Sequence, residues 1–336
     1  MKQTIHLLGL LVLLLACKND KQSDTAHAYT DCPLTYLIDG ELYFHDFIRD
    51  EKLKFTEETE PILNFVFDEE GKTLYYSVER NGTLWLKAAN ISNPEVAPEW
   101  LISWSLDIEK DMGFSFVGMS PLYYHEGNII VMHGYNLDSF YYDLMTHYYI
   151  NKRETTQMDM DIGFIRSTYG MLSWEESYKH FKQNDNQLYY IPNSKSVCLT
   201  NKIDFKAIEE KNRDNFEIAN TRSYSYYIFS PDKSKVAFGV GMLEGSEWVV
   251  GPFCLANVDG SKQMALLESN FTVVSNPIWL NNNEFAFRSF EGKLYIANNN
   301  EKSIEMIAEG VFDFKTRIRR RYSQLLFLFE KQKRCK

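Results

Sequence analysis

Short stretches in which apolar and polar residues alternate recur along this chain, and turn-forming residues separate them. Residues 67–76 and 229–238 align without a gap, each as an aromatic residue, a polar turn and an apolar stretch. Turn residues at a fixed offset before apolar positions with a period of two are typical of β-hairpins. Looser copies occur at residues 124–131, 184–190 and 279–287. The pattern therefore predicts a series of hairpins.

A further strand-like segment follows each hairpin, and one more lies near the N-terminus. The anchors of these segments are apolar residues separated by 42, 56, 57, 56 and 41 positions: Leu42, Leu84, Phe140, Val197, Phe253 and Leu294. Steps of this size suit repeated units of four short strands with variable loops. We therefore predict an all-β fold, a six-bladed β-propeller.

The two ends of the repeat series are incomplete in complementary ways. Residues 34–56 supply the later strands of a unit, whereas residues 311–314 and 325–329 supply early strands. Pairing the first and last strands in one sheet would close a ring and leave few exposed strand edges. We expect the propeller to be closed by N- and C-terminal strands that share one blade.

One repeat carries a recognisable motif. Ser230-Pro231-Asp232 before residues 235–238, with a degenerate copy at 277–287, resembles the repeat of TolB-like six-bladed β-propellers, which is also found in the propeller of prolyl oligopeptidases. This resemblance implies a TolB-like six-bladed β-propeller over most of the chain. A pair of β-sandwiches and a seven-bladed propeller are the alternatives that the repeat leaves open.

The N-terminal residues have the pattern of a secretory signal. Residues 1–3 are a short basic start, residues 7–15 are an apolar run, and Leu14-Leu15-Ala16-Cys17 follows. The run is shorter than the roughly 20 residues that cross a bilayer, and it ends at a small-residue cleavage site. The quartet resembles the lipobox of bacterial lipoproteins, which implies that Cys17 carries acyl chains that hold the protein to a membrane.

These features predict the organisation of the chain: signal peptide 1–16, flexible tether 17–30, β-propeller 31–330 and basic tail 331–336. Lys18-Asn19-Asp20 resembles the charged signals that direct some bacterial lipoproteins to the outer membrane, so we expect lipid anchoring there, on the periplasmic or surface-exposed face. Cys32 and Cys335 lie near the two ends of the folded body and could form a disulfide if those ends meet.

Composition excludes some partners and chemistries. The net charge of −10 and the pI near 5.3 argue against a nucleic-acid partner, because phosphate binding needs a concentrated basic face. The cysteines form no C-x-x-C pair and have no regular spacing to histidine, so we expect no metal site. Motifs for cofactors and for known nucleophiles are also missing, and we assign no cofactor and no catalytic residue.

The predicted function is non-enzymatic binding of a protein, peptide or glycan. Aromatic side chains with polar tips recur at such sites, and loops on rigid scaffolds often carry them. Candidate binding residues lie in one hairpin and in an insertion at 166–182 that interrupts the strand pattern: Tyr123, Tyr124, His125, Trp174 and Tyr178. The alternative is a lyase or hydrolase acting on polysaccharide, with histidines 125, 133, 147 and 180 and nearby carboxylates as its chemical groups.

Overall fold

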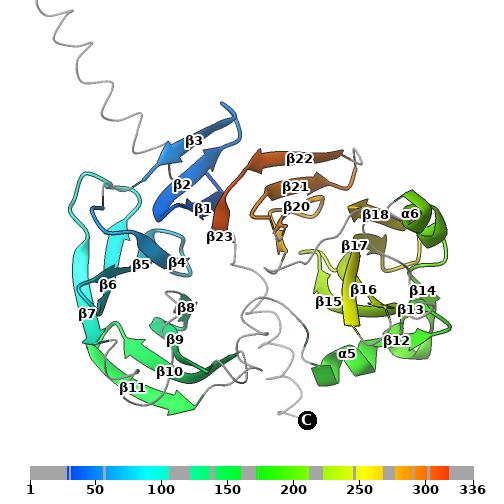
Figure 1. The fold of residues 1–336 in the computed structure, drawn as a ribbon, viewed down its shortest axis with the longest axis horizontal. Coiled ribbons are helices and arrows are strands. Elements are labelled where there is room, and N and C mark those ends of the chain that lie inside the picture. Colours follow the sequence, from blue (N-terminus) through cyan, green and yellow to red (C-terminus); the bar gives the residue numbers. More distant parts are fainter. Residues whose placement is uncertain are drawn as a thin grey trace, which may run out of the picture. The chain divides into compact units, whose positions relative to one another are not determined.

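The computed structural model describes residues 29, 32–55, 58–105, 122–136, 141–159, 172, 174–211, 222–244, 247–267, 277–289, 291–300 and 303–317. The chain divides into two compact units, residues 1–160 and residues 161–336. Strands dominate both units (Figure 1), which confirms the all-β prediction. Within the described part of the chain, no helix is long and apolar enough to cross a membrane.

The first unit consists of antiparallel sheets built from strands that are consecutive in the sequence. The first contains β1 (Leu34–Ile38), β2 (Glu41–Asp46) and β3 (Glu51–Lys54). The second has the order β4 (Ile62–Phe67), β5 (Thr73–Arg80), β6 (Thr83–Asn90) and β7 (Glu99–Ser105). The third has the order β8 (Leu122–His125), β9 (Asn128–Asn136), β10 (Tyr141–Tyr149) and β11 (Glu154–Asp159).

The second unit repeats this construction and adds short helices. One sheet contains β12 (Phe181–Asn184), β13 (Gln187–Tyr190) and β14 (Val197–Cys198), flanked by α5 (Trp174–His180), η1 (Pro192–Ser194) and α6 (Phe205–Lys211). The next has β15 (Arg222–Phe229), β16 (Lys235–Glu244), β17 (Glu247–Asn257) and β18 (Met264–Leu267). The last has β19 (Ile278–Trp279), β20 (Glu284–Arg288), β21 (Leu294–Asn298) and β22 (Ser303–Ala308), and strand β23 (Val311–Thr316) follows.

Two-residue turns set the register of several hairpins. In each of them both central residues have positive φ, the geometry of the type I′ turn that matches the twist of the flanking strands. Asn and Gly reach this region at the lowest cost. The turns are Asp39-Gly40, Asn81-Gly82, Glu126-Gly127 and Asp185-Asn186.

The two segments that align without a gap fold in the same way. In one hairpin the amide of Asp68 donates to the carbonyl of Thr73 at 3.0 Å, and in the other Ser230 donates to Lys235 at 2.9 Å. The acidic side chain of each turn accepts backbone amides, Asp68 from Lys72 at 2.8 Å and Asp232 from Ser234 at 3.0 Å. The sequence prediction of hairpins at these positions is confirmed.

Apolar clusters join successive sheets face to face within each unit. Phe44 of β2 packs with Phe65 and Tyr76 of the next sheet, while Tyr75 packs with Leu122 and other residues of the sheet after that. Because neighbouring residues of a strand point to opposite faces, Tyr75 and Tyr76 contact different neighbouring sheets, and both are buried. Equivalent clusters join β12–β14 to β15–β18, and β15–β18 to β19–β22.

Some predicted features lie outside the described residues. These are the signal peptide and Cys17, the strand expected at 325–329, the basic tail at 331–336, and Cys335. Cys32 is buried in the core of the first unit. Its disulfide with Cys335, and the closure of the ring, therefore stay predictions. The insertion at 166–182, which interrupts the strand pattern, contains helix α5.

Candidate functional site

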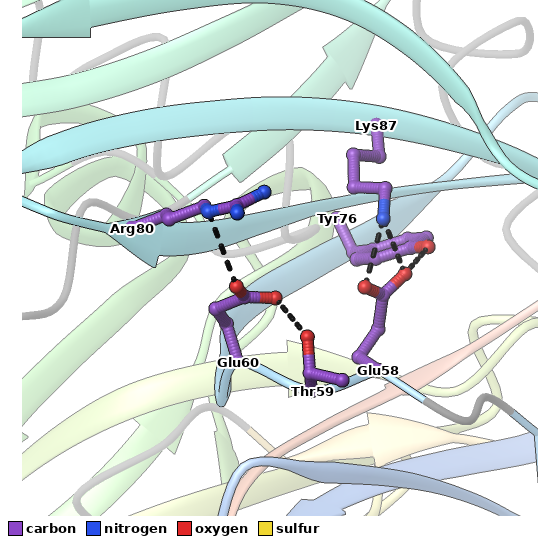
Figure 2. A network of polar contacts seen from close by, with 6 residues as sticks. All are labelled: Glu58, Thr59, Glu60, Tyr76, Arg80 and Lys87. Atoms are coloured by element: carbon purple, nitrogen blue, oxygen red, sulfur yellow. Dashed lines mark hydrogen bonds and ion pairs between the residues drawn. The ribbon is translucent and has the colours of Figure 1, made fainter.

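The segment between β3 and β4 brings two carboxylates onto the second sheet of the first unit (Figure 2). Glu58 meets Lys87 of β6, and its carboxylate oxygens lie 2.6 and 2.8 Å from the lysine Nζ. Two residues later, Glu60 lies 3.5 Å from the guanidinium of Arg80 and accepts a hydrogen bond from Thr59 at 2.6 Å. The linker is therefore held to the sheet by two ion pairs.

The two ion pairs differ in burial. The side chains of Lys87 and Glu58 are 6% and 12% exposed, whereas those of Arg80 and Glu60 are 57% and 24% exposed. Coulombic attraction is weak in water and much stronger where water is excluded, but burial also costs each charge its hydration. The Lys87–Glu58 pair therefore depends on complete hydrogen bonding around both charged groups.

Aromatic side chains complete the surroundings of the buried ammonium group. Lys87 Nζ lies 4.2 Å from the ring centroid of Trp100 and 5.7 Å from that of Tyr76. A cation above an aromatic face is attracted by the ring quadrupole, and the attraction grows when the cation is desolvated. Tyr76 also donates its hydroxyl to the Glu58 carboxylate. Burial and then this bond raise the pKa of Tyr76, so the phenol stays a donor.

The position of Lys87 follows from the alternation of β6. Trp85, Lys87 and Ala89 point to the face that packs against the β1–β3 sheet, and Lys87 is 5% exposed there. A lysine in an inward position of an apolar strand is the signal that sequence reasoning could have used. Its partner Glu58, 29 residues earlier in the chain, has no such signal.

The cluster presents an aromatic surface to solvent. Trp100 of the outer strand β7 is 46% exposed, and its ring meets Trp85 edge to face with centroids 5.1 Å apart. The indole is held from below by the buried cation and from the side by a second indole. A fixed, half-exposed tryptophan suits contact with the apolar face of a sugar or with a peptide side chain. Both charged groups are already paired, so the cluster offers a binding surface and no unengaged acid or base.

The candidate residues of β8 have different environments. Tyr123 is 5% exposed and belongs to the core, so its hydroxyl is a poor contact for a ligand. Tyr124 stacks on Tyr75 with centroids 6.0 Å apart, and burial raises the pKa of its phenol. The side chain of His125 is 42% exposed and lies 3.9 Å from Glu126. Of these three residues, only His125 exposes a large part of its side chain to solvent.

Another histidine of the first unit, His147, lies on β10, two strands from β8 in the same sheet. Burial, and then the nearby His125, lower the pKa of His147 below its usual value of 6.5. His147 is therefore neutral over a wider pH range than an exposed histidine. Among the residues that the structure describes, no group of three His, Cys, Asp or Glu side chains is placed to hold a metal ion.

The other candidates belong to helix α5 of the second unit. Trp174 begins this helix, and Tyr178 on its surface is 67% exposed. These two residues belong to the second unit, whereas the candidates on β8 belong to the first.

The second unit has a shallow cavity of about 330 Å³ between the segment 202–208 and strand β18. The amide of Gln263 in its wall accepts from Lys202 N at 2.7 Å and donates to the carbonyl oxygens of Cys198 and Gly260. These bonds fasten neighbouring loops to each other. The cavity is thus lined by groups that already serve the fold.

Similarity to known proteins is found at the level of structure and not of sequence. No protein-family model matches the chain, and no curated protein sequence matches it. A solved structure, TolB from Acinetobacter baumannii, is similar with a TM-score of 0.43 and 12% sequence identity. The match covers 85% of this chain and 66% of the TolB chain, so this chain spans less than two thirds of that structure.

Proposed function

We propose that this chain is a bacterial lipoprotein, anchored in the outer membrane through Cys17, whose sheets close into a six-bladed β-propeller of the TolB type. In this proposal it binds a protein, peptide or glycan without chemical turnover. The observation that supports it most directly is the face-to-face packing of consecutive antiparallel sheets within each unit. Successive sheets of a propeller pack in this way, and its loops and outer strands are held on a rigid scaffold.

The described aromatic surface favours binding over catalysis. Trp100 is fixed by Lys87 and Trp85 and still exposes nearly half of its surface, and Tyr178 exposes more. Such side chains supply contact area at a low cost in conformational entropy. In this proposal the first unit contributes ligand contacts through Trp100, Tyr124 and His125, and the second unit has a separate candidate contact in Tyr178.

The membrane anchor is tested at the lipidation site. Cys17→Ala should abolish labelling of the protein by a fatty-acid probe, because the variant lacks the sulfur that accepts the first acyl chains, and it should leave the signal peptide uncleaved. Labelled cells are analysed by gel fluorescence, and membrane fractions are separated by density. Cys198→Ala is the matched control, since that residue lies in the folded second unit. Undiminished labelling of Cys17→Ala would disprove the lipoprotein proposal.

Binding without turnover is tested with the four histidines at 125, 133, 147 and 180. The protein is incubated with purified polysaccharides, and the release of reducing ends and of unsaturated sugars is measured. We expect neither product. Binding to a glycan array should survive simultaneous replacement of the four histidines by alanine, because His125 is one proposed contact among several and none of the four has a required role. Turnover that the four replacements remove would instead support the polysaccharide lyase or hydrolase.

A further inference from the structure

The hairpin formed by β2 and β3 ends in an exposed apolar tip. Ile48 is 92% exposed, the highest value for any large apolar side chain among the described residues, and its neighbour Phe47 is 42% exposed. Single exposed apolar residues are common on protein surfaces, but two adjacent ones at the end of a hairpin form a projecting contact. The tip is defined here as Phe47 and Ile48.

Hydrogen bonds and ring contacts hold the turn that carries the tip. Asp46 accepts the backbone amides of Ile48 at 2.8 Å and Arg49 at 3.2 Å, which fixes the start of the turn. The ring of Phe47 meets the buried ring of His45 edge to face, with centroids 4.5 Å apart. His45 Nε2 in turn lies 3.7 Å from Asp50 at the other end of the turn. The two apolar side chains are thus exposed by a fixed backbone, so their ordering costs little on contact.

The tether enters the fold on this same hairpin. The ring of Tyr29 packs against Phe44 and Phe55, each with centroids 5.3 Å apart, and its hydroxyl donates to the carbonyl of Lys54 at 2.7 Å. Phe44 lies three residues before Phe47, which is about 10 Å along a strand. Tyr29 follows Cys17 by twelve positions, a stretch that spans at most about 43 Å. A lipid on Cys17 therefore keeps the tip within reach of the membrane surface.

We propose that Phe47 and Ile48 insert into the lipid surface to which the chain is tethered, so that the anchor and the hairpin together orient the protein. This inference rests on the proposed lipidation of Cys17. Burial of apolar side chains at the boundary of headgroups and acyl chains favours such contact, and a second weak contact becomes effective when the first holds the protein nearby.

The charges near the tip indicate what drives the insertion. The turn carries the acids Asp46, Asp50 and Glu51 against the bases Arg49 and Lys52, a net charge of −1 over residues 46–52. Anionic headgroups attract basic segments and do not attract this one. Insertion should therefore depend on apolar contact and persist in vesicles without anionic lipid.

The test measures the depth of the tip in a bilayer. Full-length lipidated protein carrying Cys198→Ser and Cys335→Ser is labelled with a polarity-sensitive nitrobenzoxadiazole probe at Ile48→Cys, in vesicles of phosphatidylethanolamine and phosphatidylglycerol. Val96→Cys, in the exposed segment between β6 and β7, is the matched control, since Val96 is 56% exposed. Ile48 is almost fully exposed, so its substitution should leave the fold intact. We expect blue-shifted emission and several-fold stronger quenching by brominated lipid at position 48 than at position 96.

Each outcome decides between the two proposals. Strong quenching at position 48, retained in phosphatidylcholine vesicles, supports insertion of the tip. Equal emission and quenching at both positions, in a chain that carries acyl groups and floats with the vesicles, overturns the insertion and leaves the anchor standing. In that case the tip would be available to a protein partner. A chain without acyl groups overturns the proposed anchor and the inference with it.

Discussion

Replacing Lys87 with methionine should lower the free energy of unfolding by about 3 to 5 kcal/mol, because it leaves the buried Glu58 without its counter-ion. Methionine approximates the lysine stem in volume, so the loss reports the charge and its hydrogen bonds. The carboxylate would keep only the hydroxyl of Tyr76 as a described side-chain donor (Figure 2). Urea unfolding followed by tryptophan fluorescence measures the change, and Trp85 and Trp100 lie beside the site.

The neighbouring ion pair supplies the control for this experiment. Arg80→Met breaks the ion pair with Glu60. This pair joins the same linker to the same sheet, but its side chains are more exposed to water. The expected loss is below about 1 kcal/mol, because exposed pairs contribute little. Removing both buried charges, with Glu58→Gln added to Lys87→Met, should recover part of the lost stability. Equal losses for Lys87→Met and Arg80→Met would show that burial of the pair does not matter.

Deletion of the chain from Val311 onward should destabilise the whole protein, if the first and last strands share one blade as proposed. The deletion removes strand β23 and would leave unpaired strand edges on both sides of the break. Folded domains are stable by only about 5 to 15 kcal/mol, so the loss of a closing strand should abolish cooperative unfolding at the temperature of the intact protein. Differential scanning calorimetry of both chains measures this. A truncated chain that melts at the original temperature contradicts closure.

Single substitutions of two phenylalanines in β23 distinguish the loss of side-chain packing from the loss of the strand itself. Phe314 is 2% exposed and Phe312 is 39% exposed, so the same residue type occurs twice in one strand with very different burial. Phe314→Ala should cost about 3 to 5 kcal/mol by leaving a cavity, and Phe312→Ala about 0.5 kcal/mol. Similar losses for the two variants would contradict the difference in burial between the two side chains.

The hairpins could be predicted from the sequence because their causes are local. Asn81-Gly82 can adopt positive φ at both positions, and an Asp or Ser at positions 68 and 230 bonds to the residue that ends its own turn. Each cause lies within about six residues of its effect. The period of two in the flanking strands adds the register, since a slip by one residue would move every apolar side chain to the other face.

The candidate site was predicted less well, and particular residues show why. Tyr123 and Tyr124 are adjacent in the sequence, yet the first is buried and the second stacks on Tyr75 of another sheet. Which tyrosine of such a pair exposes its hydroxyl to solvent depends on how the neighbouring sheet packs against the strand. The pattern of β8 contains no information about that sheet. The sequence could therefore identify the segment, but it could not identify which of its side chains is accessible.

The sequence by itself determined the strand-rich class, the places of the turns and the segments that pair as hairpins, because turn chemistry and alternation act over a few residues. The tertiary structure decided that Lys87 meets Glu58 beneath Trp100, and that Ile48 stays exposed at a hairpin tip beside the entry of Tyr29. These outcomes depend on contacts between segments far apart in the chain. Burial and electrostatic pairing are properties of the surroundings that packing creates, and a local pattern cannot specify them.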